Sequence, residues 1–263
     1  MNLIISPDQL HRMLKSTLLI VDTRSFSEYE ESHIPGAVNV DLMQFHWLDT
    51  SSIGIRDFNR QSRILLSNMG IRPETPVVFY DNISGSSAAR GVWLLLYFSH
   101  NKVAMLDGGI SEWKRAGCPI ERKTNPFRRA KFTGKVNRKV LADYHDVKSH
   151  MLRTHSVLLD VRSSSEYSGV VARASRVGHI PGALNIDWSD NLKGNWFKSS
   201  ADLKRLYDKI PHNASVITYC QGGYRAANTF VILTKLGYKN VKMYLGSWGE
   251  WGNRHDLPVE KSF

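Results

Sequence analysis

Residues 22–29, with the sequence DTRSFSEY, recur as DVRSSSEY at residues 160–167, and this repetition decides how the chain is organised. The offset between the two copies is 138 residues. The pentapeptide HIPGA follows each copy, at residues 33–37 and 179–183, and the second copy carries eight extra residues between the two blocks. A period longer than a hundred residues indicates two duplicated domains and not a solenoid.

Each copy alternates short apolar runs with helical patterns, which predicts an α/β fold with a buried parallel sheet in each domain. Helix starts are expected at three serines, because Ser6 precedes Pro7-Asp8-Gln9 and because Ser25 and Ser163 each have a glutamate three residues on. The expected strands lie at residues 18–21, 77–80 and 103–106 in the first copy and at 157–159, 216–219 and 241–245 in the second.

The composition is that of a folded globular protein of two ordinary domains. The 263 residues are 42% hydrophobic and 22% charged, which argues against disorder, collagen and coiled coil. The longest apolar run, residues 92–98, is far shorter than the ~20 residues that a transmembrane helix needs, so no membrane partner is expected. The amino-terminal residues show neither a basic leader nor a small-residue cleavage site, so we expect a cytoplasmic protein.

The net charge of +11 is concentrated in one stretch, because residues 122–139 hold eight Lys or Arg and no acid. We interpret residues 121–136 as a basic interdomain linker between a first domain, 1–120, and a second domain, 137–263. Only Phe127 and Phe132 interleave with these cations, and no base-reading module is evident. A nucleic-acid partner is therefore disfavoured, and the charge is expected to face solvent.

The two copies differ in chemistry at one strand end, where residues 78–81 read VFYD and residues 217–220 read ITYC. Asp81 thus stands in the first copy where Cys220 stands in the second. Ligands of open α/β sheets bind beyond the carboxyl ends of the strands, so Cys220 occupies the usual functional edge. The other cysteine, Cys118, follows a helix ending without a glycine-rich loop, and a structural role is expected for it. Two cysteines are too few for a structural zinc site, so we expect no metal.

The loop after Cys220 has the composition of an anion cradle. Adjacent glycines allow positive φ, so that several N–H groups turn toward one point beside a helix N-terminus. Such positions lower a cysteine pKa from ~8.5 to ~3.5–7.5, which supplies a thiolate at neutral pH. Arginine adds a planar donor fork suited to an oxyanion. The predicted catalytic residue is Cys220, and the predicted binding loop consists of Gln221, Gly222, Gly223, Tyr224, Arg225 and Ala226.

The duplicated D-x-R-x-x-x-E-Y and HIPGA blocks, the CQGGYRA loop and the later LGSWGEW segment together resemble the tandem-domain rhodaneses, the thiosulfate sulfurtransferases. The resemblance implies two similar domains, each a five-stranded parallel sheet flanked by helices, with Asp81 marking the first as inactive. It implies that Cys220 takes the outer sulfur of thiosulfate as a persulfide, releases sulfite, and passes the sulfur to cyanide or to a thiol. No cofactor is implied. Tyr224 would shape the mouth of the site.

Three alternatives remain beside thiosulfate. Related phosphatase loops place five residues between cysteine and arginine, whereas Cys220 and Arg225 enclose four, which disfavours phosphatase activity. Mercaptopyruvate sulfurtransferases resemble this chain too, but they bind the substrate carboxylate with an arginine at the position where this chain has Glu166. Mercaptopyruvate remains an alternative donor, because Arg173 and Arg176 could take the place of that arginine. A sulfur-relay module that exchanges persulfide with a partner protein is the third alternative. Trp248 is expected to pack against the sheet or to wall the cleft.

Overall fold

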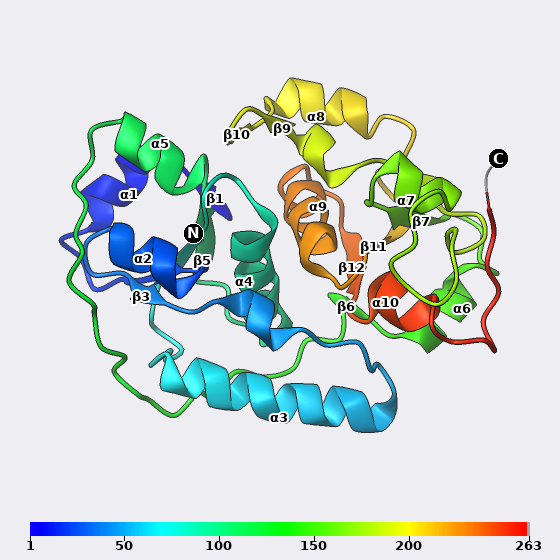
Figure 1. Cartoon of the computed structure of the whole chain (residues 1–263), viewed down its shortest axis with the longest axis horizontal. Coiled ribbons are helices and arrows are strands. Elements are labelled where there is room, and N and C mark those ends of the chain that lie inside the picture. Colours follow the sequence, from blue (N-terminus) through cyan, green and yellow to red (C-terminus); the bar gives the residue numbers. More distant parts are fainter. Residues whose placement is uncertain (262–263) are drawn as a thin grey trace. The chain divides into compact units, whose positions relative to one another are not determined.

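The computed structural model describes residues 1–261, and the chain divides into two compact units that are described separately (Figure 1). Unit 1 comprises residues 1–46, 56–137 and 193–197. Unit 2 comprises residues 47–55, 138–192 and those from 198 onward. Among residues 1–261, no helix is both long and apolar enough to cross a membrane.

Unit 1 is built on a five-stranded sheet with the strand order β1-β5-β4-β2-β3, and every pairing in it is parallel. The elements in chain order are β1 (Ile4–Ile5), α1 (Pro7–Met13), β2 (Leu19–Asp22), α2 (Phe26–Glu31), β3 (Val38–Asn39), η1 (Leu42–Phe45), α3 (Ser52–Asn68), β4 (Val77–Tyr80), α4 (Ser86–Tyr97), β5 (Val103–Leu106) and α5 (Gly109–Arg115). Helix α3 begins within residues 47–55, which cluster with unit 2.

Unit 2 repeats this topology in the strand order β6-β12-β11-β7-β8, again with parallel pairings. Its elements are β6 (Leu141–Ala142), α6 (Tyr144–His150), β7 (Ser156–Asp160), α7 (Ser164–Ser168), β8 (Leu184–Asn185), η2 (Trp188–Asn191), α8 (Ser200–Leu206), β11 (Ser215–Tyr219), α9 (Tyr224–Lys235), β12 (Asn240–Tyr244) and α10 (Ser247–Trp251). A separate pair of strands, β9 (Leu192–Lys193) and β10 (Trp196–Phe197), lies between η2 and α8 in the chain and forms a two-stranded sheet of its own. The predicted fold of two five-stranded parallel α/β domains is confirmed.

Both central strands are buried on both faces, which explains their unbroken apolar runs. Val78 of β4 and Ile217 of β11 occupy equivalent places in two hydrophobic clusters, one in each unit. Trp113 of α5 and Trp251 of α10 close these clusters and are fully buried. The three predicted capping serines, Ser6, Ser25 and Ser163, each accept the backbone N–H three residues on.

All six predicted strands form, and none of their ends differs from the predicted residue by more than one position. Six strands, β1, β3, β6, β8, β9 and β10, were not predicted, because each is two residues long and shows no readable alternation. The first four lie at the edges of the two five-stranded sheets, where each pairs with a longer neighbour, such as Ile4 beside Met105.

The basic segment differs from the solvated linker that its composition suggested, because its backbone is anchored on unit 1. The Ala130 amide donates to the Ser67 carbonyl at 2.9 Å, and the Phe132 amide donates to Ser67 Oγ at 3.2 Å. Phe132 is buried and meets Phe98 edge to face at 5.5 Å. The cationic side chains remain exposed, as expected, but they are attached to an ordered strip.

Two short segments belong to the unit opposite to the one that their sequence position suggested. Residues 47–55 cluster with unit 2, and residues 193–197 cluster with unit 1. Hydrogen bonds explain the second assignment, since the Phe197 amide donates to Asp107 Oδ1 at 3.0 Å and the Ser84 amide to the Asn195 carbonyl at 2.9 Å. The structural units therefore depart from the predicted ranges of 1–120 and 137–263.

Candidate active site

Cys220 lies between the central strand of unit 2 and a helix start. It follows the last residue of β11, Tyr219, and precedes α9, which begins at Tyr224 and runs for twelve residues. Gly223 caps this helix with φ +85°, a left-handed conformation that a side chain would strain. The glycine turns the chain sharply enough for the strand end and the helix start to face each other.

The sulfur of Cys220 receives a backbone hydrogen bond from within this turn. The Gly223 amide donates to Sγ at 3.1 Å. The positive end of the α9 dipole also favours negative charge at this position. The Cys220 side chain is buried, with 1% of its surface exposed. The site thus combines a shielded sulfur with a hydrogen-bond donor, which an inert core cysteine does not require.

The first turn of α10, residues 246–250 with the N-cap Gly246, holds the backbone of the cysteine loop. The Trp248 amide donates to the Cys220 carbonyl at 2.9 Å, and the Gly249 amide donates to the Gln221 carbonyl at 2.8 Å. The Cys220 amide in turn donates to Ser247 Oγ at 3.3 Å. Ser247 has φ +52°, an uncommon conformation for a residue with a side chain. These bonds fix the direction in which the Cys220 side chain leaves the strand.

Thr50 anchors this turn of α10, and no motif in the sequence pointed to it. Its amide donates to Glu250 Oε1 at 2.9 Å, and its hydroxyl donates to Glu250 Oε2. The same hydroxyl accepts the Tyr144 amide at 3.1 Å, while the Tyr244 hydroxyl donates to Glu250 Oε2 at 2.7 Å. Thr50 is 1% exposed. No local pattern revealed it, because its partners lie about 100 and 200 residues further along the chain.

Replacing Thr50 by valine is expected to loosen the first turn of α10 and, through it, the cysteine loop. The change keeps the shape of the side chain but leaves the partly buried Tyr144 amide without its acceptor and removes one donor from the Glu250 carboxylate. We expect the free energy of unfolding, measured by urea denaturation, to fall by about 2 kcal/mol. The rate of Cys220 alkylation by iodoacetamide should change in the same variant. Thr50→Ser keeps the hydroxyl and should have the stability and the alkylation rate of the wild type. If Thr50→Val were as stable as the wild type, the hydrogen bonds of the Thr50 hydroxyl would not be needed.

Arg225 does not stand free at the end of the loop. Its Nη1 donates to Glu166 Oε2 at 2.6 Å and its Nη2 to Glu166 Oε1 at 2.9 Å, so the donor fork is used by a carboxylate of its own chain. Burial acts to raise the pKa of Glu166, but the hydrogen bonds and charge of Arg225 outweigh it and lower that pKa to about 2. Burial acts to lower the pKa of Arg225, and pairing with Glu166 raises it overall. The ion pair locks the loop to α7.

The two other predicted arginines lie in different surroundings. Arg173 is largely exposed, with Nε 3.5 Å from Glu166 Oε1, and its carbonyl accepts Gln221 Nε2 at 2.8 Å. Arg176 instead donates to four backbone carbonyls at the end of α10, including those of Leu257 at 2.6 Å and Trp251 at 2.7 Å. Arg173 therefore lies beside the loop, whereas the donors of Arg176 are taken up by the fold.

The remaining predicted loop residues are buried or half-buried. Tyr224 and Ala226 are buried in the first turn of α9, and the Ala226 carbonyl accepts the Thr218 hydroxyl at 3.2 Å. Trp248 is 1% exposed and lies under the Arg162 guanidinium, 4.6 Å from the ring centroid. Trp248 packs in the core of unit 2 and touches the loop through its backbone.

Asp81 fills the equivalent turn of unit 1 with its own negative charge. Its carboxylate accepts the amides of Gly85 at 3.1 Å, Ser87 at 3.2 Å and Ala88 at 3.1 Å. Burial raises the pKa of Asp81 to about 6 in spite of these hydrogen bonds. The turn of unit 1 therefore holds an internal carboxylate where the turn of unit 2 presents a thiol.

The paired histidines and the Asp-x-Arg motifs serve the fold of each unit. His179 Nδ1 contacts the Tyr167 carbonyl at 2.9 Å, and its ring stacks on Tyr167 at 3.7 Å. Arg162 forms a bidentate pair with Asp160 inside unit 2. Within residues 1–261, no three His, Cys, Asp or Glu side chains gather as ligands for a metal ion.

Comparison with known proteins agrees with this geometry. A family model described as Rhodanese-like domain matches residues 6–116 and 143–254. The chain is 32% identical over 262 residues to a thiosulfate sulfurtransferase of Pseudomonas aeruginosa, covering 98% of this chain and 97% of the relative. It is 32% identical over 251 residues to the sulfur carrier protein TtuD of Thermus thermophilus, covering 89% of this chain and 87% of that relative. The structure of SseA from Escherichia coli, a 3-mercaptopyruvate sulfurtransferase, has the same fold, with a TM-score of 0.80, 24% identity, and coverage of 94% of this chain and 99% of SseA.

Proposed function

Because this chain belongs to the rhodanese-like family, we propose that it is a sulfurtransferase that moves a sulfane sulfur from thiosulfate, through a Cys220 persulfide, to cyanide or a thiol. The observation that carries the proposal is the hydrogen bond from the Gly223 amide to Cys220 Sγ at the N-terminus of α9. A donor at this place stabilises a charged sulfur both before and after sulfur transfer.

The reaction proceeds in two balanced steps. The Cys220 thiolate attacks the outer sulfur of thiosulfate, the sulfur–sulfur bond of the donor breaks, and sulfite leaves with the electron pair. Cyanide or a thiolate then attacks the terminal sulfur of the persulfide, and the bond to Cys220 Sγ breaks to restore the thiolate. The Gly223 amide already faces Sγ before the reaction, so it can stabilise the charged sulfur without reorganisation of the turn.

The charges beside the loop favour thiosulfate over mercaptopyruvate. Glu166 neutralises Arg225, and Arg173 adds an exposed positive charge near that pair. The site therefore offers a net positive charge to a small dianion. It offers no free arginine for the carboxylate of mercaptopyruvate, because position 166 is a glutamate and Arg225 is paired with it. The burial of Cys220 favours small donors and acceptors over a protein thiol.

Intact-mass measurement of the protein after incubation with thiosulfate tests the proposal directly. We expect a gain of one sulfur atom, removed by cyanide with release of thiocyanate. The kcat/KM for thiosulfate should exceed that for 3-mercaptopyruvate by at least about tenfold, or about 1.4 kcal/mol in transition-state free energy.

Two outcomes would contradict this assignment. A higher kcat/KM for mercaptopyruvate would make that compound the donor. A protein that gains no sulfur from either compound, but accepts it from a persulfidated partner, would be a sulfur relay, the function that the name of the Thermus thermophilus relative suggests for that protein.

A further inference from the structure

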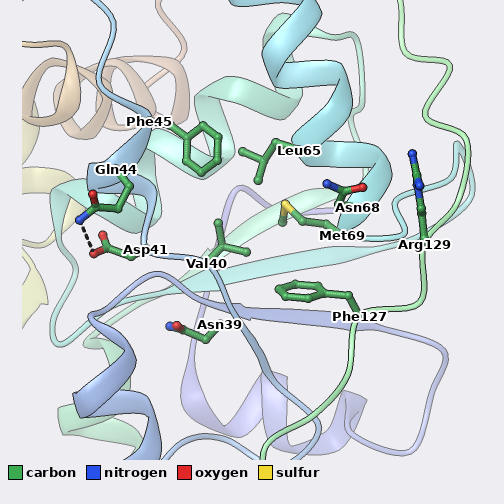
Figure 2. Close-up of a pocket in the computed structure, with 10 residues that line it drawn as sticks. All are labelled: Asn39, Val40, Asp41, Gln44, Phe45, Leu65, Asn68, Met69, Phe127 and Arg129. Carbon is green, nitrogen blue, oxygen red and sulfur yellow. Dashed lines mark hydrogen bonds between the residues drawn. The ribbon is translucent and has the colours of Figure 1, made fainter.

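Unit 1 carries an apolar hollow whose lining does not include Asp81. It has a volume of about 610 Å³ and is lined by Val40, Phe45, Leu65, Met69 and Phe127, among others. Figure 2 shows these five side chains around one space, contributed by the β3–η1 region, by α3 and by the basic segment. Phe45 is 40% exposed and Phe127 is 46% exposed. Two phenylalanines so accessible at one hollow offer contact surface for an apolar group from outside.

A second hollow of about 660 Å³ adjoins the first, since both are lined by Met69 and Arg129. Arg72 and Arg128 also line the second hollow, whereas no aspartate or glutamate does. Asp41, the acid at the first hollow, accepts the Met43 amide at 3.0 Å and Gln44 Nε2 at 3.3 Å, so its carboxylate caps η1 (Figure 2). The two hollows together form a groove with an apolar end beside Phe45 and Phe127 and a cationic end beside Arg72 and Arg128.

The cations of the basic segment are held in place but are not neutralised. Six of them are exposed and form no ion pair among residues 1–261: Arg122, Lys123, Arg128, Arg129, Lys131 and Lys135. Two of the six, Arg128 and Arg129, line the groove itself. The backbone of the segment is anchored at both ends of the strip, by the pairing of Glu121 with His33 and by the hydrogen bonds to Ser67. A fixed row of uncompensated charges attracts a complementary partner with a smaller loss of entropy than a flexible linker would.

We propose that this groove of unit 1 binds a protein partner through an acidic segment that carries a large apolar side chain. The apolar side chain would occupy the hollow beside Phe45 and Phe127, and the flanking carboxylates would contact Arg128 and Arg129. An interface of this kind has a buried apolar anchor and a charged rim. Unit 1 has no cysteine at its strand end, so the role assigned to it is recognition and is independent of sulfur transfer.

A nucleic acid fits the groove less well than an acidic peptide. The first hollow is lined by aliphatic as well as aromatic side chains, and a single cation, Arg129, reaches it. Nucleic-acid sites combine base-stacking aromatics with cations that follow the phosphates. Here the cations concentrate beside the hollow, which suits a carboxylate-flanked apolar side chain.

The experiment selects binders of the full chain from a displayed library of random dodecapeptides and measures the enriched peptides by fluorescence polarisation. We expect enriched sequences in which acidic residues flank a large apolar residue.

The double variant Arg128→Glu with Arg129→Glu should weaken the binding of the enriched peptides by at least about tenfold, and so should Phe127→Ser. Lys204→Glu with Lys209→Glu is the matched control, because it changes the net charge equally through two exposed lysines of unit 2, and it should change binding by less than about twofold.

Three results would overturn the proposal. Selection could enrich no acidic–apolar sequence. The control pair could weaken binding as much as the groove pair, which would show an attraction to overall charge. A single-stranded oligonucleotide could bind more tightly than every enriched peptide and lose affinity in the groove variants, which would assign the surface to nucleic acid. Thiosulfate turnover measured in the same variants keeps this test separate from the proposed reaction, since it should not change.

Discussion

Replacing Cys220 by serine is expected to abolish persulfide formation and to lower sulfur transfer from thiosulfate by about three orders of magnitude or more. A serine hydroxyl at the same place is not ionised at neutral pH and cannot carry the transferred sulfur. The Gly223 amide would still point at the side chain, so the loop should keep its conformation. Steady-state turnover with cyanide and the intact mass after thiosulfate exposure measure the two losses.

Cys118→Ser provides the matched control for this prediction. Cys118 is half-buried, with Sγ 3.9 Å from His11 Nδ1, and burial together with the charge of Asp8 raises the pKa of its thiol. It is therefore poorly suited to act as a thiolate, and its replacement should leave turnover unchanged. A sulfur gain that survives in Cys220→Ser and disappears in Cys118→Ser would refute the assignment of the nucleophile.

The second large effect concerns stability, since Glu166→Gln should lower the free energy of unfolding at pH 7 by about 3 kcal/mol. The Glu166 side chain is 5% exposed and that of Arg225 is 19% exposed, so the variant leaves a mostly buried guanidinium without its counter-ion. A double-mutant cycle with Arg225→Met, measured by urea denaturation, isolates the coupling of the pair. Arg205→Gln, in an exposed ion pair with Asp202, is the control and should cost less than about 1 kcal/mol.

The contribution of Glu166 should depend on pH in a defined direction. The folded protein holds the pKa of Glu166 at about 2, below its ordinary value of 4.5. The unfolded chain therefore binds the proton first as the pH falls, and stability decreases. The advantage of wild type over Glu166→Gln should be complete above pH 4.5 and should vanish as the pH falls toward 2. An advantage that stays constant over this range would mean that the ion pair does not hold Glu166 ionised.

Pairing of Arg225 with Glu166 revises the role that the sequence suggested for this arginine. The loop composition predicted that the donor fork of Arg225 would face an oxyanion, and Glu166 was noted only as standing where mercaptopyruvate sulfurtransferases carry an arginine. The two side chains neutralise each other in the structure. Arg173, a weaker candidate in the sequence, is left as the exposed cation beside the loop.

The sequence by itself determined the duplication, the parallel α/β fold and the strand end at which Cys220 and Asp81 differ. These features depend on local properties of the chain, such as apolar runs, capping residues and glycines at turns, and the offset of 138 residues repeats them. Only the tertiary structure decided which distant groups meet. Thr50 reaches Glu250, Glu166 takes the donor fork of Arg225, and Ser67 holds the basic segment. A hydrogen-bonding group or charge in a sequence has many candidate partners, and its choice among them is made only when folding brings one of them within about 3 Å.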